Sequence, residues 1–402
     1  MKVVVAQKGA REHYLVARAL HRRGMLAQLL VDWYGPRSGM LRRLLGWLPG
    51  GAARAGGAIA PDLPRELVRS LPGLALRIKA SEAWAARRGN PFSSFLRTDR
   101  AFATAVARAD LPAHEVLFAY SYAALEAMEA EQARGRLTVL DQIDPGPIEH
   151  DIVREETAAW PQYAVPWPAA PAGYFDRVKK EWEIADLIVV NSDWSREGVI
   201  AGGAPAAKVE VLPLAFEPPQ DEVIRERAAG TALRALWLGT VNIRKGIHYL
   251  VEAAKLLESE PVEFLIAGPL AIRQEAVAAA PRNMRWLGPV PRSRIGEIYR
   301  QADVFVLPTL SDGFAITQLE AIAHGLPLVV TPNCGRVVED GVTGIVVPAR
   351  NPSALAAALR RFIREPDLRR RMSLRCREAA GAFSVDAFAQ RLAEILQRRL
   401  GS

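Results

Sequence analysis

The chain has 402 residues, of which 50% are apolar and 24% are charged, and its net charge is +8. This length suits two domains of roughly 100–200 residues each, and the composition is that of an ordinary globular protein. The sequence contains no run of about 18 uncharged apolar residues and no signal-peptide pattern at its N-terminus, so no membrane-spanning helix is expected. Its two cysteines suggest neither a disulfide framework nor a zinc site, and a cytoplasmic location is expected.

The positive charge is concentrated in the first part of the chain. Residues 1–100 contain 18 Lys and Arg against 6 Asp and Glu, a net charge of +12, which suggests an anionic partner. Nucleic acid is not expected, because no nucleic-acid-binding motif is recognisable. The segment Met40–Pro49 mixes apolar and basic residues, which favours peripheral association with the inner face of an anionic membrane. A solvated basic loop, or packing inside the protein or at a dimer interface, is the alternative.

In chain order, the first half alternates short β-branched runs with stretches of helical periodicity, which predicts a parallel sheet covered by helices. Two irregular stretches interrupt this pattern, residues 36–62 and the proline-rich residues 160–173. Strands are expected at Lys2–Ala6, Leu26–Asp32, Glu115–Ala119, Leu137–Asp141 and Leu187–Val190. Helices are expected at Arg11–Arg23, Ala101–Ala109, Tyr122–Arg134 and Tyr174–Ala185.

A pause in the alternation at residues 213–230 marks the expected domain boundary. The same pattern then resumes, which predicts a second parallel α/β domain. A short break at Gly381–Ser384 precedes a last helix at Val385–Arg399. Strands of the second half are expected at Leu233–Leu238, Glu263–Ala267, Met284–Leu287, Val304–Leu307 and Leu328–Thr331.

The strongest local signal for chemistry lies in residues 308–325. A buried strand is expected to end at Leu307, a glycine-containing turn follows, and a helix is expected to begin near Ala315. The free backbone N–H groups at such a helix start suit a phosphate group. Asp312 lies in the turn, whereas Glu320 lies about one and a half turns into the helix. Taken singly, each carboxylate would be explained as a turn residue or as a solvated helix charge.

This segment resembles the acidic motif of glycosyltransferase family 4 (glycosyl transferases group 1), the retaining enzymes of GT-B fold, in which E-G-F-G is followed by a second Glu eight residues after the first. Further segments resemble motifs of that family in the same order. The resemblance covers about residues 170–400, and residues 1–169 resemble the family only loosely. The matching segments are Glu181–Ser192, Gly239–Gly246, Ala267–Pro269, Leu287–Val290, Ala302–Pro308 and Gly341–Gly344.

The resemblance implies a GT-B architecture of two Rossmann-like parallel α/β domains that face a central cleft. Residues 1–212 would form the acceptor domain and residues 230–380 the donor domain, with the C-terminal helix, residues 385–402, crossing back onto the first. It also implies a metal-independent hexosyltransferase that uses a UDP- or GDP-linked sugar as its donor. No separate cofactor and no metal ion are expected, and the acceptor would be a sugar, a cell-envelope glycan, a lipid-linked acceptor or a small molecule.

The resemblance also assigns roles to individual residues. Lys245 would meet the diphosphate as a compact point charge, with Arg244 beside it. The sugar hydroxyls would be held by Asp312 and the backbone N–H groups of Gly313, Phe314 and Ala315. The remaining donor contacts would come from the N–H groups of Ile316 and Thr317 at the phosphates, Glu320 at the ribose, the backbone around Val290 at the base and Gly9 as a neighbour of the diphosphate.

The sequence departs from the family pattern at three positions. Asp312 replaces a Glu, and Thr240 occupies the position of an Arg, a loss for which Arg244 could compensate. Ala315 replaces the second Gly of the motif, which is a mild change if its φ is negative. These departures leave one alternative function open, a catalytically weak or inactive GT-B sugar-nucleotide-binding protein.

Two other enzyme classes are disfavoured by the sequence. A nicotinamide enzyme would need a G-x-G-x-x-G after a strand, and none is present. Asp141 and Asp144 have the wrong spacing to share one metal ion. Related transferases often carry a histidine after this strand, where Asp141 or Asp144 stands here, and His150 follows on an expected helix.

Overall fold

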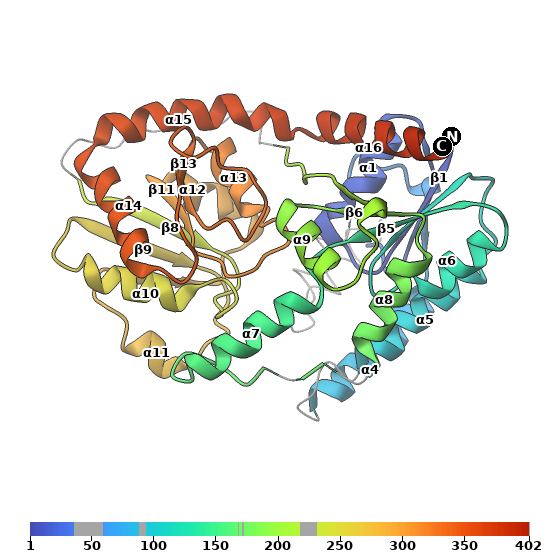
Figure 1. The fold of residues 1–402 in the computed structure, drawn as a ribbon, viewed down its shortest axis with the longest axis horizontal. Coiled ribbons are helices and arrows are strands. Elements are labelled where there is room, and N and C mark those ends of the chain that lie inside the picture. The colour runs from blue at the N-terminus through green and yellow to red at the C-terminus, as the bar shows by residue number, and fades with distance from the viewer. Residues whose placement is uncertain (36–58, 88–93, 168, 171–172, 218–230, 402) are drawn as a thin grey trace.

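A computed structural model describes residues 1–35, 59–87, 94–167, 169–170, 173–217 and 231–401. These residues form two α/β domains that lie side by side (Figure 1). Each domain is built on a parallel β-sheet, which confirms the expected fold class. The apolar and basic segment at residues 40–49 lies outside the described residues.

In the described residues of the first domain, the parallel sheet has the strand order β3-β2-β1-β4-β5-β6-β7. The chain reverses its direction of travel across the sheet between β1 and β4, which is where ligands bind in open α/β sheets. The strands are β1 (Val3–Gln7), β2 (Leu26–Val31), β3 (Val68–Ser70), β4 (Val116–Tyr120), β5 (Leu137–Gln142), β6 (Leu187–Val190) and β7 (Val209–Val211).

The central strands of this sheet are continuous apolar runs, because helices cover both faces. Val3, Val4 and Val5 on β1 are all fully buried, although successive side chains point to opposite faces. The covering helices are α1 (Leu15–Arg22), α4 (Pro72–Arg87), α5 (Phe95–Ala107), α6 (Leu125–Gln132), α7 (Pro147–Ala159), α8 (Tyr174–Ile184) and α9 (Asp193–Ala201).

The sheet of the second domain repeats this plan with the strand order β10-β9-β8-β11-β12-β13 among the described residues. Its strands are β8 (Leu233–Leu238), β9 (Val262–Ala267), β10 (Met284–Gly288), β11 (Val304–Leu307), β12 (Leu328–Val330) and β13 (Gly344–Val346). Its helices are α10 (Ile247–Leu256), α11 (Gln274–Ala278), α12 (Ile295–Arg300), α13 (Thr317–Ala323) and α14 (Pro352–Arg364).

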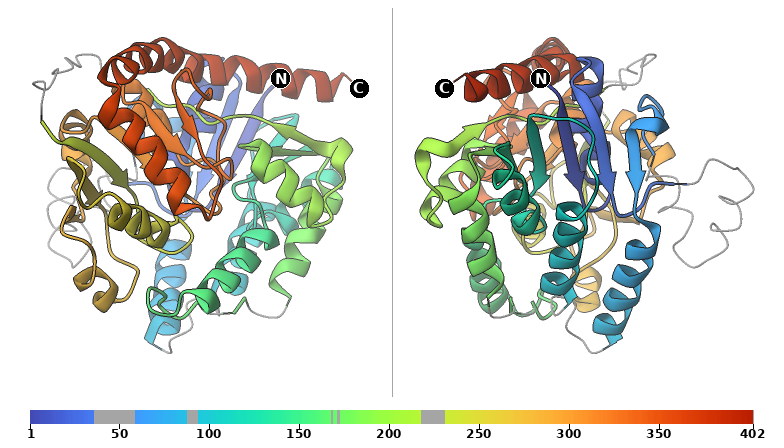
Figure 2. Two further views of the ribbon diagram at one scale, coloured as in Figure 1. Left: turned by 60° about the vertical axis from the view of Figure 1, so that its left-hand side comes forward. Right: turned by 90° about the vertical axis from the view of Figure 1, so that its right-hand side faces the viewer.

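Two C-terminal helices connect the domains along one side of the molecule. Figures 1 and 2 show α15 (Pro366–Ala380) lying over the second domain and α16 (Val385–Leu400) lying over the first. The Ser384 hydroxyl caps α16 by accepting a hydrogen bond from the Ala387 amide, and α16 then packs against α1. The last helix therefore belongs physically to the first domain.

A second connection runs through α7 and the residues that follow it. Figure 1 shows α7 leaving the first domain and reaching toward α10 and α11 of the second. Beyond its end, Ala164 forms a β-bridge with Ile272, and the Arg273 amide donates a hydrogen bond to the Tyr163 carbonyl oxygen. Residues 147–164 thus form a strap between the two domains.

The structure corrects the expected helix Arg11–Arg23. Its first four residues form a 3₁₀ turn, Arg11–Tyr14, and α1 begins only at Leu15. Glu12, His13 and Tyr14 have φ values of 50°, 53° and 61°, in the left-handed region that non-glycine residues rarely occupy. Tyr14 is fully buried in the core, and this burial offsets the backbone strain that helical periodicity does not reveal.

The sequence pattern also missed β3, β7 and β13. Each has three residues, which is too short for a period-two alternation to register. All three lie at sheet edges, so missing them does not change which strands form the centre of each sheet.

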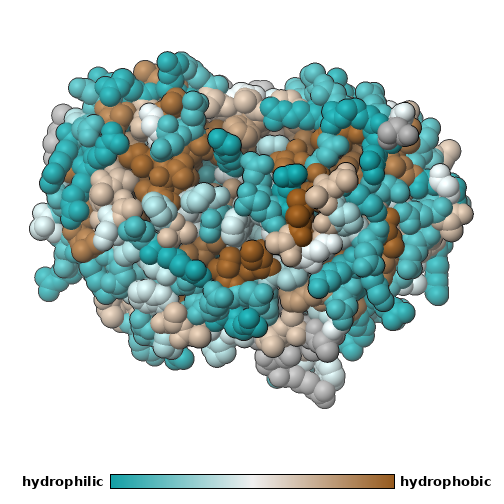
Figure 3. Space-filling model, viewed as in Figure 1, coloured by the Kyte–Doolittle hydropathy of each residue, from teal (hydrophilic) through white to brown (hydrophobic). Residues whose placement is uncertain are grey.

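The surface is mainly hydrophilic on the face drawn in Figure 3, and its apolar atoms gather in separate patches. In the part of the chain that the structure describes, no helix is both long enough and apolar enough to cross a membrane.

Candidate functional site

A cavity of about 460 Å³ lies between the two domains, at the ends of β5, β8 and β11. From the first domain it is lined by the 3₁₀ turn and by Asp144 and Glu149, which follow β5. From the second domain it is lined by Arg244 and Lys245, and by residues 312–317, which follow β11. The structure therefore brings most of the expected site residues into one interdomain cavity.

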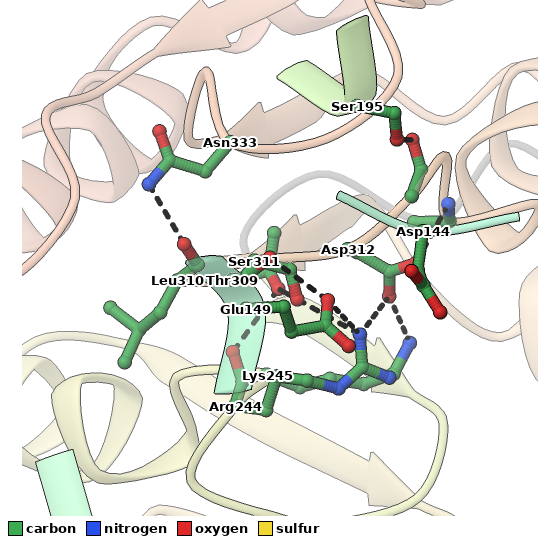
Figure 4. Close-up of polar contacts among 12 residues, drawn as sticks. Asp144, Glu149, Ser195, Arg244, Lys245, Thr309, Leu310, Ser311, Asp312 and Asn333 are labelled. Atoms are coloured by element: carbon green, nitrogen blue, oxygen red, sulfur yellow. Dashed lines mark hydrogen bonds and ion pairs between the residues drawn. The ribbon is translucent and has the colours of Figure 1, made fainter. Parts of the chain in front are cut away.

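Asp312 lines this cavity and lies beside Arg244 and Lys245 (Figure 4). Its Oδ2 atom lies 2.7 Å from Lys245 Nζ, and its Oδ1 atom accepts a hydrogen bond of 3.2 Å from the Ala315 amide. Burial alone would raise the pKa of Asp312, but the charges of Lys245 and Arg244, together with these hydrogen bonds, lower it to about 2. The carboxylate is therefore charged throughout the neutral range.

Ala315 corrects an expectation about the turn. Ala315 stands where the family motif has its second Gly. This replacement would be mild if φ were negative, but the φ of Ala315 is +61°. In this left-handed region the Cβ atom costs about 1–2 kcal/mol relative to a right-handed conformation. The hydrogen bond from its amide to Asp312 and the one that its carbonyl oxygen accepts from the Gln318 amide hold this conformation.

The helix that follows begins two residues later than expected. α13 spans Thr317–Ala323, with Ile316 as its N-cap. Ile316 and Thr317 both line the cavity. The Thr317 hydroxyl is buried and has no hydrogen-bond partner among the described residues.

Glu320 lies one turn into α13, deeper than the residues that line the cavity. Its Oε2 atom accepts a hydrogen bond of 2.8 Å from the Tyr299 hydroxyl, and burial raises its pKa. The Tyr299 ring in turn stacks on His324, with centroids 4.6 Å apart. Glu320 is thus part of a buried polar network and is no solvated helix charge.

Val290 and Gly9, two residues that were expected to contact the donor, lie outside the lining of the interdomain cavity. Val290 is half-buried, follows β10 and packs against the core. Gly9 has a φ of +78°, and its amide donates a hydrogen bond of 2.7 Å to Asp32. Gly9 lines a neighbouring cavity in the first domain.

Close backbone approaches at two glycines fix the positions of the site residues. A Cβ atom on Gly246, directly after Lys245, would lie 1.8 Å from the Pro308 carbonyl oxygen. A Cβ atom on Gly313 would lie 2.3 Å from the Ile143 carbonyl oxygen of the first domain. Both positions therefore exclude every side chain.

The first domain also holds the Gly313 turn by hydrogen bonds. The Gly313 carbonyl oxygen accepts hydrogen bonds from the hydroxyls of Ser192 and Ser195. The Asn191 side chain donates a hydrogen bond of 2.9 Å to the Ile143 carbonyl oxygen alongside them. These contacts join the start of α9 to the turn that carries Asp312.

Arg244 has a partner that the sequence prediction did not name. Its Nη1 atom lies 3.2 Å from Glu149 Oε2 and 3.7 Å from Asp312 Oδ2, and it donates a hydrogen bond of 2.9 Å to the Ser311 carbonyl oxygen (Figure 4). A signal for Glu149 existed. Glu149 lies in the first turn of a helix that begins with a Pro and follows a buried strand. In parallel sheets, ligand-binding groups lie in this place, just after the carboxyl end of a strand.

A second cavity of about 520 Å³ lies within the first domain. It adjoins the interdomain cavity, because Arg11, Ile143, Asp144 and Glu149 line both. Its wall combines charged side chains with aromatic ones, and the aromatic residues are Phe95, Tyr120, Tyr122, Trp167, Tyr174 and Phe175. His150 belongs to this wall, where its Nδ1 atom accepts a hydrogen bond of 3.2 Å from the Trp167 indole.

Comparisons with known proteins agree with this geometry. Residues 232–365 match the family model for glycosyl transferases group 1. A D-inositol 3-phosphate glycosyltransferase of Kribbella flavida is 32% identical over 234 residues, which cover 52% of this chain and 55% of that protein. The amylovoran biosynthesis glycosyltransferase AmsK of Erwinia amylovora is 27% identical, covering 53% and 56%. The chain thus spans about half the length of these curated relatives.

Solved structures resemble the whole chain. Anabaena Alr3699/HepE, in complex with UDP and glucose, superposes with a TM-score of 0.62 at 15% identity, covering 99% of this chain and 100% of that one. Sucrose-phosphate synthase from Thermosynechococcus elongatus superposes with a TM-score of 0.65 at 16% identity, covering 100% of both chains. At these identities the likeness establishes the fold.

Proposed function

We propose that this chain, whose residues 232–365 match the family model for glycosyl transferases group 1 and whose fold is GT-B, transfers a hexosyl group from a nucleotide diphosphate-sugar to an acceptor hydroxyl. The transfer retains the anomeric configuration and needs no metal ion. The observation that carries the proposal is the interdomain cavity, in which Lys245, Asp312 and the start of α13 converge.

The donor would lie in the interdomain cavity with its diphosphate near Lys245. The backbone amides of Ile316 and Thr317 would face the phosphate oxygens, which suits the binding of anions at helix starts. Asp312, charged at neutral pH, would accept hydrogen bonds from sugar hydroxyls. The complexes of Anabaena HepE with UDP and with UDP-glucose support a donor of this class.

The remaining donor contacts follow the family resemblance. Glu320 would hold the ribose hydroxyls, the backbone around Val290 would contact the base, and Gly9 would lie near the diphosphate. Negative charge grows on the diphosphate when the bond to the anomeric carbon breaks. Lys245 and Arg244 would stabilise that charge, because fixed donors act most strongly where charge develops.

The acceptor would enter through the aromatic cavity of the first domain. This cavity meets the donor site at Asp144 and Glu149, so an acceptor hydroxyl could reach the anomeric carbon from there. Aromatic faces such as those of Trp167 and Tyr174 offer apolar surface to a sugar ring, and polar groups around them can fix its orientation. A glycan or a lipid-linked sugar fits this lining.

The enzyme would act at an anionic membrane surface, with α4 as one contact. The outer face of α4 exposes Leu76 (74%) and Trp84 (48%) beside the exposed cations Arg77 and Arg87. Apolar and basic side chains on one helix face favour the interface of an anionic bilayer. The aromatic cavity is lined by Lys79 of the same helix, so a membrane-borne acceptor would be close to the site.

Nucleotide release from a panel of UDP-, GDP- and ADP-sugars tests the proposed function. An active transferase releases nucleoside diphosphate in an acceptor-dependent way, and the preferred donor also raises the thermal midpoint. A donor that raises the midpoint without any release, over a broad acceptor panel, would instead favour an inactive sugar-nucleotide-binding protein.

A further inference from the structure

Glu149 is a first-domain residue that reaches into the donor half of the site. It lies in the first turn of α7, which begins at Pro147 with Gly146 as its N-cap. This end of α7 is tightly packed, since a Cβ atom on Gly198 of α9 would lie 2.6 Å from Pro145 Cβ and 2.9 Å from Ile148 Cγ2. The backbone that carries Glu149 therefore has little freedom to shift.

The other end of α7 is fixed on the second domain. Glu156 Oε2 lies 3.0 Å from His248 Nε2 and accepts a hydrogen bond of 3.1 Å from the Tyr249 hydroxyl, and Oε1 contacts the Arg350 guanidinium. Glu149 and Glu156 are seven residues apart, about two helical turns. The helix is thus held at both ends, so the position of the Glu149 carboxylate depends on the positions of both domains.

The contacts of Glu149 fix one side of the Arg244 guanidinium. Glu149 Oε2 accepts a hydrogen bond of 2.9 Å from the Ser311 hydroxyl and one of 3.2 Å from Arg244 Nη1. The Trp194 indole donates a hydrogen bond of 3.0 Å to the same Ser311 hydroxyl, which holds the carboxylate's partner in place. Among the described residues the side-chain contacts of Arg244 all use Nη1, which leaves Nη2 and Nε for a ligand in the cavity that Arg244 lines.

The geometry also divides two cations between two carboxylates. Asp312 Oδ2 lies 2.7 Å from Lys245 but 3.7 Å from Arg244, whereas Glu149 lies 3.2 Å from Arg244. Without Glu149, the nearest opposite charge to Arg244 would be Asp312, and the guanidinium would move toward it and away from a donor phosphate. We propose that Glu149 is a positioning residue that holds Arg244 toward the donor's diphosphate, so that the first domain sets the donor affinity of the second. This inference rests on the proposed function.

The surroundings of Glu149 give the ion pair a pH dependence. Burial raises the pKa of Glu149 to about 7, the positive charge of Arg244 opposes this shift, and the negative charges of Asp144 and Asp312 add to it. The Tyr122 hydroxyl, which donates a hydrogen bond to Asp144, is a further titratable group on this side, and Arg11 and His150 line the same cavity. Above about pH 7 Glu149 is charged and holds Arg244, and as the pH falls below 7 the pair is lost.

The test is a double-mutant cycle on nucleotide affinity, measured by calorimetry with UDP, uridine, GDP and guanosine. The variants are Glu149→Gln, Arg244→Gln and the double variant, with Asp151→Asn as the matched control. Asp151 is exposed on the same helix and pairs only weakly with Arg154 at 3.0 Å in solvent. Thermal midpoints establish that each variant is folded.

Glu149→Gln is expected to weaken nucleoside diphosphate binding about tenfold, which is about 1.4 kcal/mol, and to leave nucleoside binding unchanged. In the Arg244→Gln background it should have no further effect, because Glu149 acts through Arg244. The rise in wild-type diphosphate affinity between pH 6 and pH 8 should be reduced in Glu149→Gln, and Asp151→Asn should behave as wild type. A conservative Glu149→Asp variant should recover part of the loss.

Additive losses in the cycle, or tighter diphosphate binding by Glu149→Gln, would overturn the inference while leaving the transferase proposal intact. Tighter binding is what simple removal of a negative charge near an anion would give. If the wild-type protein bound neither diphosphate, the proposed function itself would fail, and the positioning role of Glu149 would fail with it.

Discussion

Two adjoining cavities of the described residues, the interdomain cavity and the aromatic-lined cavity of the first domain, differ in chemistry. The interdomain cavity is built from charged groups, with Lys245 and Arg244 facing Asp312 at the start of a helix. The first-domain cavity adds aromatic rings to its charged side chains, and one of its cations, Lys8, is paired with Asp99 at 2.6 Å. Two neighbouring cations suit a diphosphate and its leaving charge, whereas aromatic faces suit an uncharged ring. The comparison thus supports the proposal that donor and acceptor bind on different sides.

The first way to test this division is to remove the charge on the donor side. Lys245→Ala should lower turnover about 100-fold or more, as the loss of one preorganised charge-stabilising donor does in other enzymes. It also leaves Asp312 without its closest cation, so the pKa of Asp312 should rise. Steady-state kinetics of nucleotide release measure the effect.

Lys255→Ala is the matched control for this experiment. Lys255 lies on the exposed side of α10 and pairs with Glu252 at 2.8 Å. Its removal changes the net charge equally but should leave turnover within about twofold of wild type, because exposed pairs contribute little. Equal kinetics for both variants would show that another group stabilises the leaving diphosphate.

For the acceptor side, we predict that the protein binds membranes and that this binding depends on lipid charge and on salt. Replacing Leu76 and Trp84 with Ser should lower binding to phosphatidylglycerol-rich vesicles at least tenfold, since each apolar side chain contributes about 1.5–3 kcal/mol on burial. Binding by the wild type should require anionic lipid and weaken with salt. Vesicle co-sedimentation measures it, and Leu374→Ser on α15 of the second domain is the control.

Wild-type protein that stays in the supernatant with anionic vesicles at low salt would contradict membrane association through the first domain. The acceptor cavity would then be expected to take soluble sugars. The segment at residues 40–49 lies outside the described residues, so variants of Leu44 and Trp47 provide a separate test of its contribution.

A finer prediction separates two carboxylates within the donor side. Glu320→Gln should weaken binding of free nucleoside diphosphate by about tenfold, because the ribose is present in donor and product alike. Asp312→Asn should leave that affinity nearly intact but impair transfer, because its partner is the sugar. Calorimetry with the nucleotide, next to turnover with the sugar donor, distinguishes them. An equal loss of nucleotide affinity in both variants would contradict this division.

The second domain could be predicted closely because its site depends on local chain geometry. The expected strands at Leu233–Leu238 and Val304–Leu307 coincide with β8 and β11, and Lys245 and Asp312 follow them directly. The carboxyl ends of adjacent parallel strands meet at one edge, so short motifs there specify a site. The roles of Lys245, Asp312 and Glu320 remain predictions until the variants are measured.

The first domain could be predicted only in outline, for physical reasons. The left-handed turn at Glu12 and His13 depends on tertiary burial, which periodicity does not encode. The contact of Glu149 with Arg244 joins residues 95 positions apart on different domains. The aromatic cavity likewise gathers side chains from distant segments, such as Phe95 and Trp167, so no short motif announces it.

The smallest expected effect concerns the strained turn at the centre of the donor side. Ala315→Gly should stabilise the protein by about 1 kcal/mol, because glycine adopts the φ of +61° without a Cβ clash, an advantage partly offset by its greater freedom in the unfolded chain. Such a change corresponds to a rise of roughly 2–4 °C in thermal midpoint. Ala321→Gly makes the same chemical change within α13, at a fully buried helical position, and should lower the midpoint instead. Equal destabilisation by both variants would mean that the turn around Ala315 stores no strain. A stabilised Ala315→Gly variant with reduced transfer would indicate that the strained amide beside Asp312 is held in place for the donor sugar.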